Sequence, residues 1–486
     1  MSSPQSSANV QNRSGKQPRI AVIGGGIAGV TAAWQLRRKL GPDARILLSE
    51  AYDRLGGKLK TVRFANGPVD MGAEAFLGVQ QSFLDLIEAV GLTDQLRRPS
   101  AARSSFFVDG KLVDIPRETL MGIPGSGDTV KEILSDADRA RLDAERDGQP
   151  MTWQRGDDAT VGQLVEARLG KAVVDSVVSP LLGGVYSCSA YDLGVRSALP
   201  QLAAALDRAG EDGQGFYLLD VINELLEQRA SAAAQRKKLG TTSVNGSPFV
   251  SFVGGYRSLI EEMMKQARPE LILNTPVEEI GRTGDGRWSI DPLGLVDAVI
   301  VATPAPTASV LLQDVAPMAS ELLDTVELSS SAVVGMRFAS DHGLPERSGV
   351  LLGADAPTEA KAFTFSSRKW PHLGDRGGAF VRASYGTKAE PWYVEATDRA
   401  LISYAMDDLY RVTGESKTPQ EFFVQRWYGG LPCYGIHHLD RMAEVQRNIA
   451  GIPGLALAGA MLNGVGVPAT AETGTEAADK ISGEFS

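Results

Sequence analysis

The residues of this sequence best suited to binding chemistry form a glycine-rich turn near its start. Gly24, Gly26 and Gly29 have the G-x-G-x-x-G spacing, which allows a tight turn, close approach of backbone to a pyrophosphate and close helix–strand packing. Glu50 follows where a ribose hydroxyl needs an acceptor. The pattern predicts a dinucleotide site whose contacts are Gly24, Gly25, Gly26, Ile27, Ala28, Gly29, Glu50 and Ala51.

The elements that must position this turn can be identified in the same stretch. A short apolar strand begins at Arg19, a helix is predicted over residues 27–40, and a second strand over 45–50. The amides and the positive dipole end of the helix would face the phosphates. A strand–turn–helix–strand unit that ends on an acid is typical of a Rossmann-like domain.

Length and charge limit what surrounds this unit. The chain has 486 residues, more than one hydrophobic core usually holds, so we expect two or three connected domains. The hydrophobic fraction of 43% and the charged fraction of 22% are ordinary for a soluble globular protein. The net charge of −10 argues against a nucleic-acid partner and against attraction to anionic lipid.

The cysteines and histidines indicate neither a disulfide framework nor a metal site. There are only two cysteines, Cys188 and Cys433, which fits a reducing compartment. The four histidines form no recognisable metal-binding constellation. There is no apolar run of about 20 residues, so we expect no transmembrane helix, although peripheral membrane contact stays open. Residues 1–18 are predicted to be a disordered tail, and the protein is predicted to be cytoplasmic.

A second motif directly follows the acid. Arg54 could form a charge-assisted bond with phosphate, and the pair Gly56-Gly57 would let backbone approach a ligand. We therefore add Arg54, Gly57 and Lys58 to the predicted contacts. The alternative is a surface turn with an incidental arginine.

Residues 24–29 followed by Glu50-x-x-x-Arg54-x-Gly56-Gly57 resemble the FAD-dependent amine oxidase and protoporphyrinogen oxidase superfamily. Residues 67–77 resemble, more narrowly, the segment beneath the flavin in bacterial heme-synthesis oxidases. The resemblance implies an FAD cofactor whose isoalloxazine is lined by Gly72, Ala73, Glu74 and Ala75. From the residues alone, Glu74 would be an exposed loop acid.

Three later segments carry the same resemblance. A strand ending in Ala302-Thr-Pro follows a predicted strand over residues 271–280, residues 425–440 are similar to the family's "RWPGGLPQY…GH" segment, and residues 464–468 match its "GVGIP" motif before a final helix. Thr470 and Glu472 depart from the usual pattern in that helix. The resemblance implies that the cofactor is also contacted by Val277, Ala302, Trp427, Ala460, Val465, Gly466 and Val467.

The resemblance also suggests where a substrate would lie. Arg103, on a hairpin predicted to turn at Asp109-Gly110, is the candidate for binding a propionate, although a surface arginine is an equal alternative. Ser187-Cys188 replaces the family's Ala-Gly, and Cys188, otherwise an inert apolar residue, could narrow the cavity. Tyr434 would cover a flavin or porphyrin edge.

We expect no catalytic side chain, because the flavin itself would abstract the hydride. His438 matches a family histidine. It could act as a base, but a structural cap on the following helix is the favoured interpretation.

The predicted fold class is α/β. A Rossmann-like FAD-binding domain would be assembled from residues 19–97, 248–304 and 440–486. A helical insertion is expected over 98–212. A substrate-binding domain with a mixed antiparallel sheet is expected over 213–247 and 305–439.

The resemblance implies an oxygen-dependent, six-electron oxidation of coproporphyrinogen III to coproporphyrin III, with hydride abstraction by FAD and production of H2O2, in heme biosynthesis. The segment over residues 72–76, the acidic balance and the lack of a membrane-inserting stretch resemble the coproporphyrinogen-oxidising branch of the family more closely, so protoporphyrinogen IX is the first alternative substrate. A flavin amine oxidase is the second. The expected partners are the tetrapyrrole, molecular oxygen and, for transient handover of the product, a ferrochelatase.

Overall fold

The computed structural model describes residues 17–64, 66–238, 248–341, 343–353 and 355–485. Nearly all of the predicted N-terminal tail and of the polar linker at 240–248 therefore lies outside the described residues. Within the described ranges, none of the helices is both long and apolar enough to cross a bilayer. Over the same ranges, no three His, Cys, Asp or Glu side chains gather as metal ligands would.

A five-stranded parallel sheet carries the glycine turn. Alternate residues of its central strand face opposite ways, so Ile20 and Val22 join one hydrophobic core while Ala21 and Ile23 join another. Helices must therefore cover both faces, as parallel sheets require. In order across the sheet, the strands are β12 (Glu270–Ile272), β2 (Arg45–Ser49), β1 (Arg19–Ile23), β16 (Ala298–Val301) and β22 (Leu455–Leu457).

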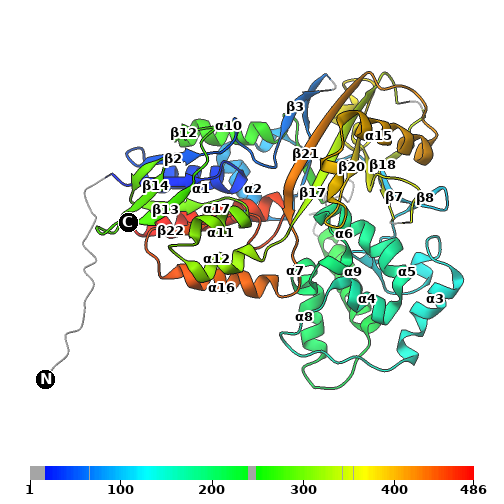
Figure 1. Cartoon of the computed structure of the whole chain (residues 1–486). Coiled ribbons are helices and arrows are strands. Elements are labelled where there is room, and N and C mark those ends of the chain that lie inside the picture. Colours follow the sequence, from blue (N-terminus) through cyan, green and yellow to red (C-terminus); the bar gives the residue numbers. More distant parts are fainter. Residues whose placement is uncertain (1–16, 65, 239–247, 342, 354, 486) are drawn as a thin grey trace.

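Two groups of helices provide this cover (Figure 1). The first face is covered by α1 (Ile27–Leu40), α2 (Gln81–Val90), α10 (Tyr256–Ala267) and α17 (Val467–Gly483). The second is covered by α11 (Ala305–Leu312), α12 (Pro317–Asp324) and α16 (His438–Ala450), with the small sheet of β13 (Glu279–Arg282), β14 (Trp288–Asp291) and β15 (Gly294–Val296). Helices from the two ends of the chain, α1 and α17, lie side by side. The predicted α/β fold is confirmed.

A seven-stranded sheet stands beside this unit (Figure 1). Its order is β21 (Glu421–Pro432), β17 (Leu328–Phe338), β20 (Ala379–Tyr385), β19 (Ala362–Phe365), β18 (Arg347–Leu352), β7 (Arg103–Val108) and β8 (Lys111–Asp114). It is mixed, because β18 and β7 run parallel while the other neighbours are antiparallel. Helix α15 (Asp398–Thr413) packs on it, and the short helices α13 (Ser366–Lys369) and α14 (Pro371–Gly374) follow β19.

A helical region completes the molecule around its own core. Its helices are α3 (Asp136–Asp143), α4 (Val161–Leu169), α5 (Lys171–Val173), α6 (Ser179–Tyr186), α7 (Val195–Ala198), α8 (Pro200–Ala209) and α9 (Leu218–Lys238). The remaining short strands form small separate sheets: β3 (Thr61–Phe64) with β4 (Gly67–Asp70), β11 (Phe249–Phe252) with β5 (Phe76–Leu77) and β6 (Leu96–Arg97), and β9 (Thr119–Leu120) with β10 (Ile123–Pro124).

The arrangement differs from the predicted domain division in three places. The hairpin β7–β8 pairs within the seven-stranded sheet instead of the helical insertion. Helix α9 packs in the helical core, because its apolar face lies against the other helices there. Helices α11 and α12 cover the nucleotide sheet. The remaining boundaries stay a prediction.

The predicted strand over residues 271–280 is broken in two. Strand β12 ends at Ile272 and β13 begins at Glu279. Asn274 adopts a left-handed conformation, and Pro276 has no amide to give to a ladder. Val277 therefore lies in a loop, which is tied to the end of β2 by the bond from Thr275 N to Glu50 O (3.0 Å).

Candidate active site

Two glycines of the turn are required by the protein's own packing. Gly24 has a φ of 105°, and a Cβ there would lie 2.5 Å from the carbonyl oxygen of Ala302. A Cβ on Gly29 would lie 1.9 Å from the carbonyl oxygen of Gly24. The turn, the helix that follows it and Ala302, directly after β16, can therefore meet only if both positions lack a side chain.

Gly26 is different, because a Cβ there would have no neighbour within 4 Å. It is the N-cap of α1, and its carbonyl accepts the first helical bond from Val30 N (2.9 Å). The packing of the protein leaves open space beside the free amides of a helix N-terminus. Such a place suits an anionic phosphate, so the residues present fit the predicted dinucleotide.

Glu50 faces the same turn from the end of β2. Its carboxylate accepts hydrogen bonds from the amides of Gly25 (2.7 Å) and Tyr52 (3.0 Å), and the residue is only 9% exposed. These bonds fix its orientation, while each oxygen keeps a second lone pair for a hydroxyl donor. Glu50 is therefore placed as a ribose acceptor would be, and Ala51 beside it is exposed.

Arg54 shapes the loop that lies across the turn. Its guanidinium donates to the carbonyl oxygens of Leu55 (3.2 Å), Gly57 (2.7 Å) and Leu59 (3.2 Å). Burial lowers the pKa of Arg54, although Glu50 and Asp53 oppose this shift. A Cβ on Gly57 would lie 3.1 Å from the Cα of Gly26, so the loop closes directly over the helix start. The predicted phosphate contact of Arg54 stays a prediction.

Gly72 brings a second group of predicted residues together. A Cβ there would lie 1.9 Å from the carbonyl oxygen of Lys58 and 3.0 Å from Cζ2 of Trp427. The indole Nε1 of Trp427 donates to the carbonyl oxygen of Met71 (3.2 Å). Strand β21 thus reaches residues 71 and 72, which are far from it in sequence and lie against Lys58. A flat cofactor ring would need these segments to be adjacent.

Glu74 is not an exposed loop acid, as its residue type alone suggested. Its carboxylate accepts hydrogen bonds from Ser366 Oγ (2.9 Å) and Lys369 Nζ (2.8 Å) and lies 3.6 Å from the Arg382 guanidinium. Burial alone would raise its pKa, but Lys369 and Arg382 outweigh burial and lower it to about 2. Glu74 is therefore ionised and held, between Ala73 and Ala75, which are both partly buried.

Asp70 and Arg382 are residues that the sequence did not single out. The Asp70 carboxylate accepts bonds from the Thr61 hydroxyl (2.5 Å) and from Tyr256 N (3.2 Å). Burial raises the pKa of Asp70 to about 7, against those hydrogen bonds and the nearby Arg382. Arg382 comes from β20, 312 residues away, so no local motif could have paired them.

Tyr434 is buried and holds the loop before α17. Its hydroxyl donates to the carbonyl oxygen of Ala460 and accepts from Gly464 N (2.9 Å). The loop leads through Val465 to Gly466, the N-cap of α17, and to Val467, its first residue. Tyr434 thus holds the loop of residues 460–466, the predicted flavin loop, through two hydrogen bonds to its backbone. Its predicted role of covering a ring edge stays untested.

His438 braces the same loop. Its Nε2 donates to the carbonyl oxygen of Met461 (2.8 Å), and its ring stacks on Tyr434 with centroids 4.0 Å apart. Burial lowers its pKa to about 4. His438 is thus bonded and stacked within the structure, and both its favoured role as a helix cap and the alternative of a base stay predictions. It is the first residue of α16, however, and His437 occupies the N-cap position.

The expectation of unpaired cysteines is wrong, because the structure joins Cys188 to Cys433 in a disulfide. The two residues are 245 positions apart in sequence. They meet because the segment after α6 and the end of β21 pack in the same hydrophobic core. Cys433 directly precedes Tyr434, so the disulfide links the helical region to the loop-supporting residues.

Arg103 lies apart from these residues. It forms an ion pair with Asp114, which also binds Arg347 (2.6 Å), and its side chain is 41% exposed. Five strand spacings separate β7 from β21, about 24 Å along the sheet. The structure therefore does not bring Arg103 together with Trp427 and the flavin-side residues.

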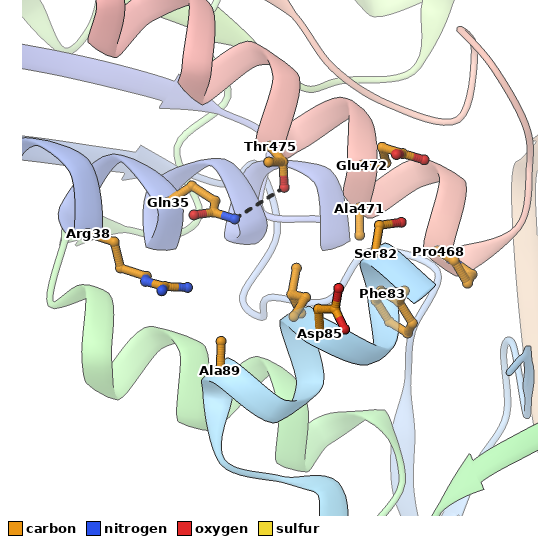
Figure 2. A pocket seen from close by; sticks show the side chains of 11 residues that line it. Gln35, Arg38, Ser82, Phe83, Asp85, Ala89, Pro468, Ala471, Glu472 and Thr475 are labelled. Atoms are coloured by element: carbon orange, nitrogen blue, oxygen red, sulfur yellow. Dashed lines mark hydrogen bonds between the residues drawn. The ribbon is translucent and has the colours of Figure 1, made fainter. Parts of the chain in front are cut away.

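A groove of about 350 Å³ approaches α17 from outside (Figure 2). It lies between α1, α2 and α17, and Gln35 on one wall donates to Thr475 on another (3.4 Å). Glu472 lines this groove, whereas Thr470 is buried and donates to the carbonyl oxygen of Gly464 (3.4 Å). Only Thr470, of the two departures from the family pattern, faces the predicted flavin loop.

Known proteins resemble this chain over nearly its whole length. A family model of flavin-containing amine oxidoreductases matches residues 27–482. The coproporphyrinogen III oxidase of Mycobacterium tuberculosis (strain ATCC 25618 / H37Rv) is 37% identical over 454 residues, which cover 92% of this chain and 94% of that protein. The coproporphyrinogen III oxidase of Mycobacterium leprae is 35% identical and covers 95% of this chain and 98% of its own.

Solved structures with a similar fold also match nearly the whole chain. A protein described as a protoporphyrinogen oxidase, from Exiguobacterium sp. 255-15, has a TM-score of 0.82 at 28% identity and covers 96% of this chain and 99% of its own. A putrescine oxidase variant, with a TM-score of 0.67 at 15% identity, shares the fold alone. The matched family, the glycine turn and the oriented Glu50 agree on an FAD cofactor. The chain belongs to the flavin-containing amine oxidoreductases and is an FAD-dependent oxidoreductase.

Proposed function

We propose that this protein oxidises coproporphyrinogen III to coproporphyrin III in heme biosynthesis, with oxygen as acceptor. One observation carries the proposal: the 37% identity to a coproporphyrinogen III oxidase across 92% of this chain. Removal of six hydrogen atoms from the porphyrinogen is balanced by reduction of three O2 to three H2O2. The bound FAD would supply the hydride acceptor for this oxidation.

The chain's own residues bind and orient the cofactor. The open space at Gly26 and the amides of α1 would receive the pyrophosphate, and Glu50 the ribose. Gly72 would lie along the ring, against Trp427. The Tyr434–His438 pair is buried and uncharged, so it helps to keep the loop before α17 in a dry environment.

The substrate choice rests on the names of the relatives and on charge. Coproporphyrinogen III carries four propionates, and protoporphyrinogen IX carries two and partitions into membranes. The net charge of −10 gives the surface little attraction for anionic lipid, which favours the water-soluble substrate. We further propose a cytoplasmic location and transient transfer of the product to a ferrochelatase.

The test begins with the absorption spectrum of the purified protein, which should show oxidised flavin. Coproporphyrinogen III, protoporphyrinogen IX and a polyamine are then offered separately, with porphyrin fluorescence and peroxide as readouts. We expect both signals with the four-propionate substrate, at three peroxides per porphyrin. Turnover of the two-propionate substrate alone would reassign the enzyme to protoporphyrinogen IX. Peroxide with the polyamine alone would overturn porphyrinogen oxidation altogether.

A further inference from the structure

We propose that Arg382 is a positioning residue with two effects on the flavin: it fixes the segment that lines the ring, and its charge favours the reduced cofactor. The inference rests on one part of the proposed function, namely that the ring lies along residues 72–75. It does not depend on which substrate is oxidised.

The positioning effect follows from three contacts to one short segment. The Arg382 guanidinium donates through Nη1 to the carbonyl oxygen of Asp70 (3.1 Å) and through Nη2 to that of Gly72 (3.2 Å), and Nη1 lies 3.6 Å from Glu74. Because these are residues 70, 72 and 74, the arginine spans the whole segment. Arg382 itself is only 9% exposed and is held in β20 between β17 and β19.

The same segment is held from its other side by a matching set of bonds. Ser251 Oγ donates to the carbonyl oxygen of Glu74 (2.8 Å), and Lys369 Nζ donates to its carboxylate (2.8 Å). Lys369 also lies over the ring of Trp370, with 5.2 Å from Nζ to the ring centroid. The seven-stranded sheet and the helix after β19 thus determine where residues 72–75 lie.

The electrostatic effect follows from the charges in this cluster. Two cations, Lys369 and Arg382, share one ionised carboxylate, Glu74. Asp70 offsets this excess only in part, since burial raises its pKa to about 7 and leaves the carboxyl partly protonated near neutral pH. The Nε–H of Arg382 has no hydrogen-bond partner among the described residues. The cluster therefore keeps a partial net positive charge next to the predicted ring position.

A positive charge near the ring stabilises the reduced flavin, which carries more negative charge than the oxidised form. Removing Arg382 and neutralising Glu74 should then shift the equilibrium in opposite directions. A purely structural role would give no such opposition, because both changes break bonds to the same segment. The sign of the shift therefore separates the two explanations.

The experiment measures the midpoint potential of bound FAD by equilibration with a redox dye, in four FAD-loaded variants. We expect Arg382→Met to favour oxidised flavin and Glu74→Gln to favour reduced flavin, each by about tenfold, or about 30 mV for two electrons. Arg382→Lys should keep the potential near that of the native protein but release FAD faster, because a lysine cannot span three acceptors. Arg196→Met breaks a similarly buried pair with Asp207 in the helical region and should change neither the potential nor the rate of FAD release.

The possible failures are distinguishable. A native protein without flavin would overturn the proposed function, whereas an FAD-loaded protein that oxidises porphyrinogen leaves it standing. In that protein, shifts of the same sign in Arg382→Met and Glu74→Gln, or no shift, would overturn the electrostatic effect. An unchanged rate of FAD release in Arg382→Lys would overturn the positioning effect. Should Arg382→Met not fold, Glu74→Gln and Arg382→Lys still decide both points.

Discussion

The two ends of the predicted cofactor site are built in different ways. At the nucleotide end, residues 24–57 supply glycines, backbone amides and one carboxylate, nearly all within one short stretch. At the flavin end, the contacts join residues 70–74 to side chains such as Arg382 and Trp427, more than 300 positions away. The nucleotide end depends on glycines, which have no side chain to block close packing. The flavin end depends on charged and aromatic side chains that tertiary structure brings together.

The largest effect should come from a comparison of two glycines within the first end. Gly24→Ala forces a Cβ against the Ala302 carbonyl in a left-handed conformation, so we expect a loss of more than about 3 kcal/mol in unfolding free energy. Gly26→Ala meets no protein atom and should leave the stability of the apoprotein unchanged while weakening FAD retention. Denaturant unfolding of both apoproteins and FAD titration measure this. Equal stabilities of the two variants would contradict the distinction.

The next effect tests how far the second end depends on long-range links. Cys188→Ser and Cys433→Ser should each lower the unfolding free energy by about 2–4 kcal/mol, as loss of a native disulfide does. Since both variants remove one bond, they should be equally destabilised, and the double variant no more so. Thiol alkylation of the unfolded native protein is the control. Two alkylated cysteines without reductant would show that the link is not formed.

The pH dependence of stability should distinguish the buried acids at the flavin end. The pKa of Asp70 is raised in the folded state, so the folded state binds this proton more tightly than the unfolded state does. The stabilisation that protonated Asp70 gives to the fold is therefore lost as pH rises from about 4 through 7. Asp70→Asn should abolish this loss. Between pH 5 and 7, the unfolding free energy of the variant should rise by roughly 1–2 kcal/mol relative to that of the native protein. Linkage allows at most about 1.4 kcal/mol for each pH unit.

Glu74 provides the internal control for that measurement. Its pKa is lowered, so its contribution is present above about pH 4.5 and is lost only as pH falls toward 2. Glu74→Gln should therefore keep most of the slope of stability between pH 5 and 7, because burial, and only to a lesser extent the Glu74 charge, raises the pKa of Asp70. If the stability of the native protein did not fall relative to that of Asp70→Asn between pH 5 and 7, the raised pKa of Asp70 would be contradicted.

The smallest effect is expected outside both ends. Arg103 is exposed, and Arg347 still neutralises Asp114 when it is removed, so Arg103→Ala should cost less than about 1 kcal/mol. Its distance from Trp427 along the sheet also predicts an unchanged KM for porphyrinogen. A several-fold rise in KM with unchanged kcat would restore Arg103 to the propionate role that its resemblance implied.

The same contrast explains what sequence reasoning could reach. The strand, turn and helix around Gly24 follow from glycine spacing and apolar periodicity, both local properties, and the helix over residues 27–40 is found as predicted. Trp427 and Gly72 could be placed near each other only through resemblance. Arg382 and the disulfide carried no signal of their own, because an isolated arginine or cysteine in a strand or loop says nothing about its partner.

The order of strands in the five-stranded sheet has a consequence for synthesis. Its central strand β1 is made before its neighbour β16, the next strand β22 and the covering helix α17, which follow hundreds of residues later. At about 5–20 residues per second, the glycine turn waits roughly 20 to 90 seconds for the last of them. Stable loading of the cofactor is therefore a late event, and a chain interrupted before residue 455 would leave its nucleotide-binding turn without the elements that close it.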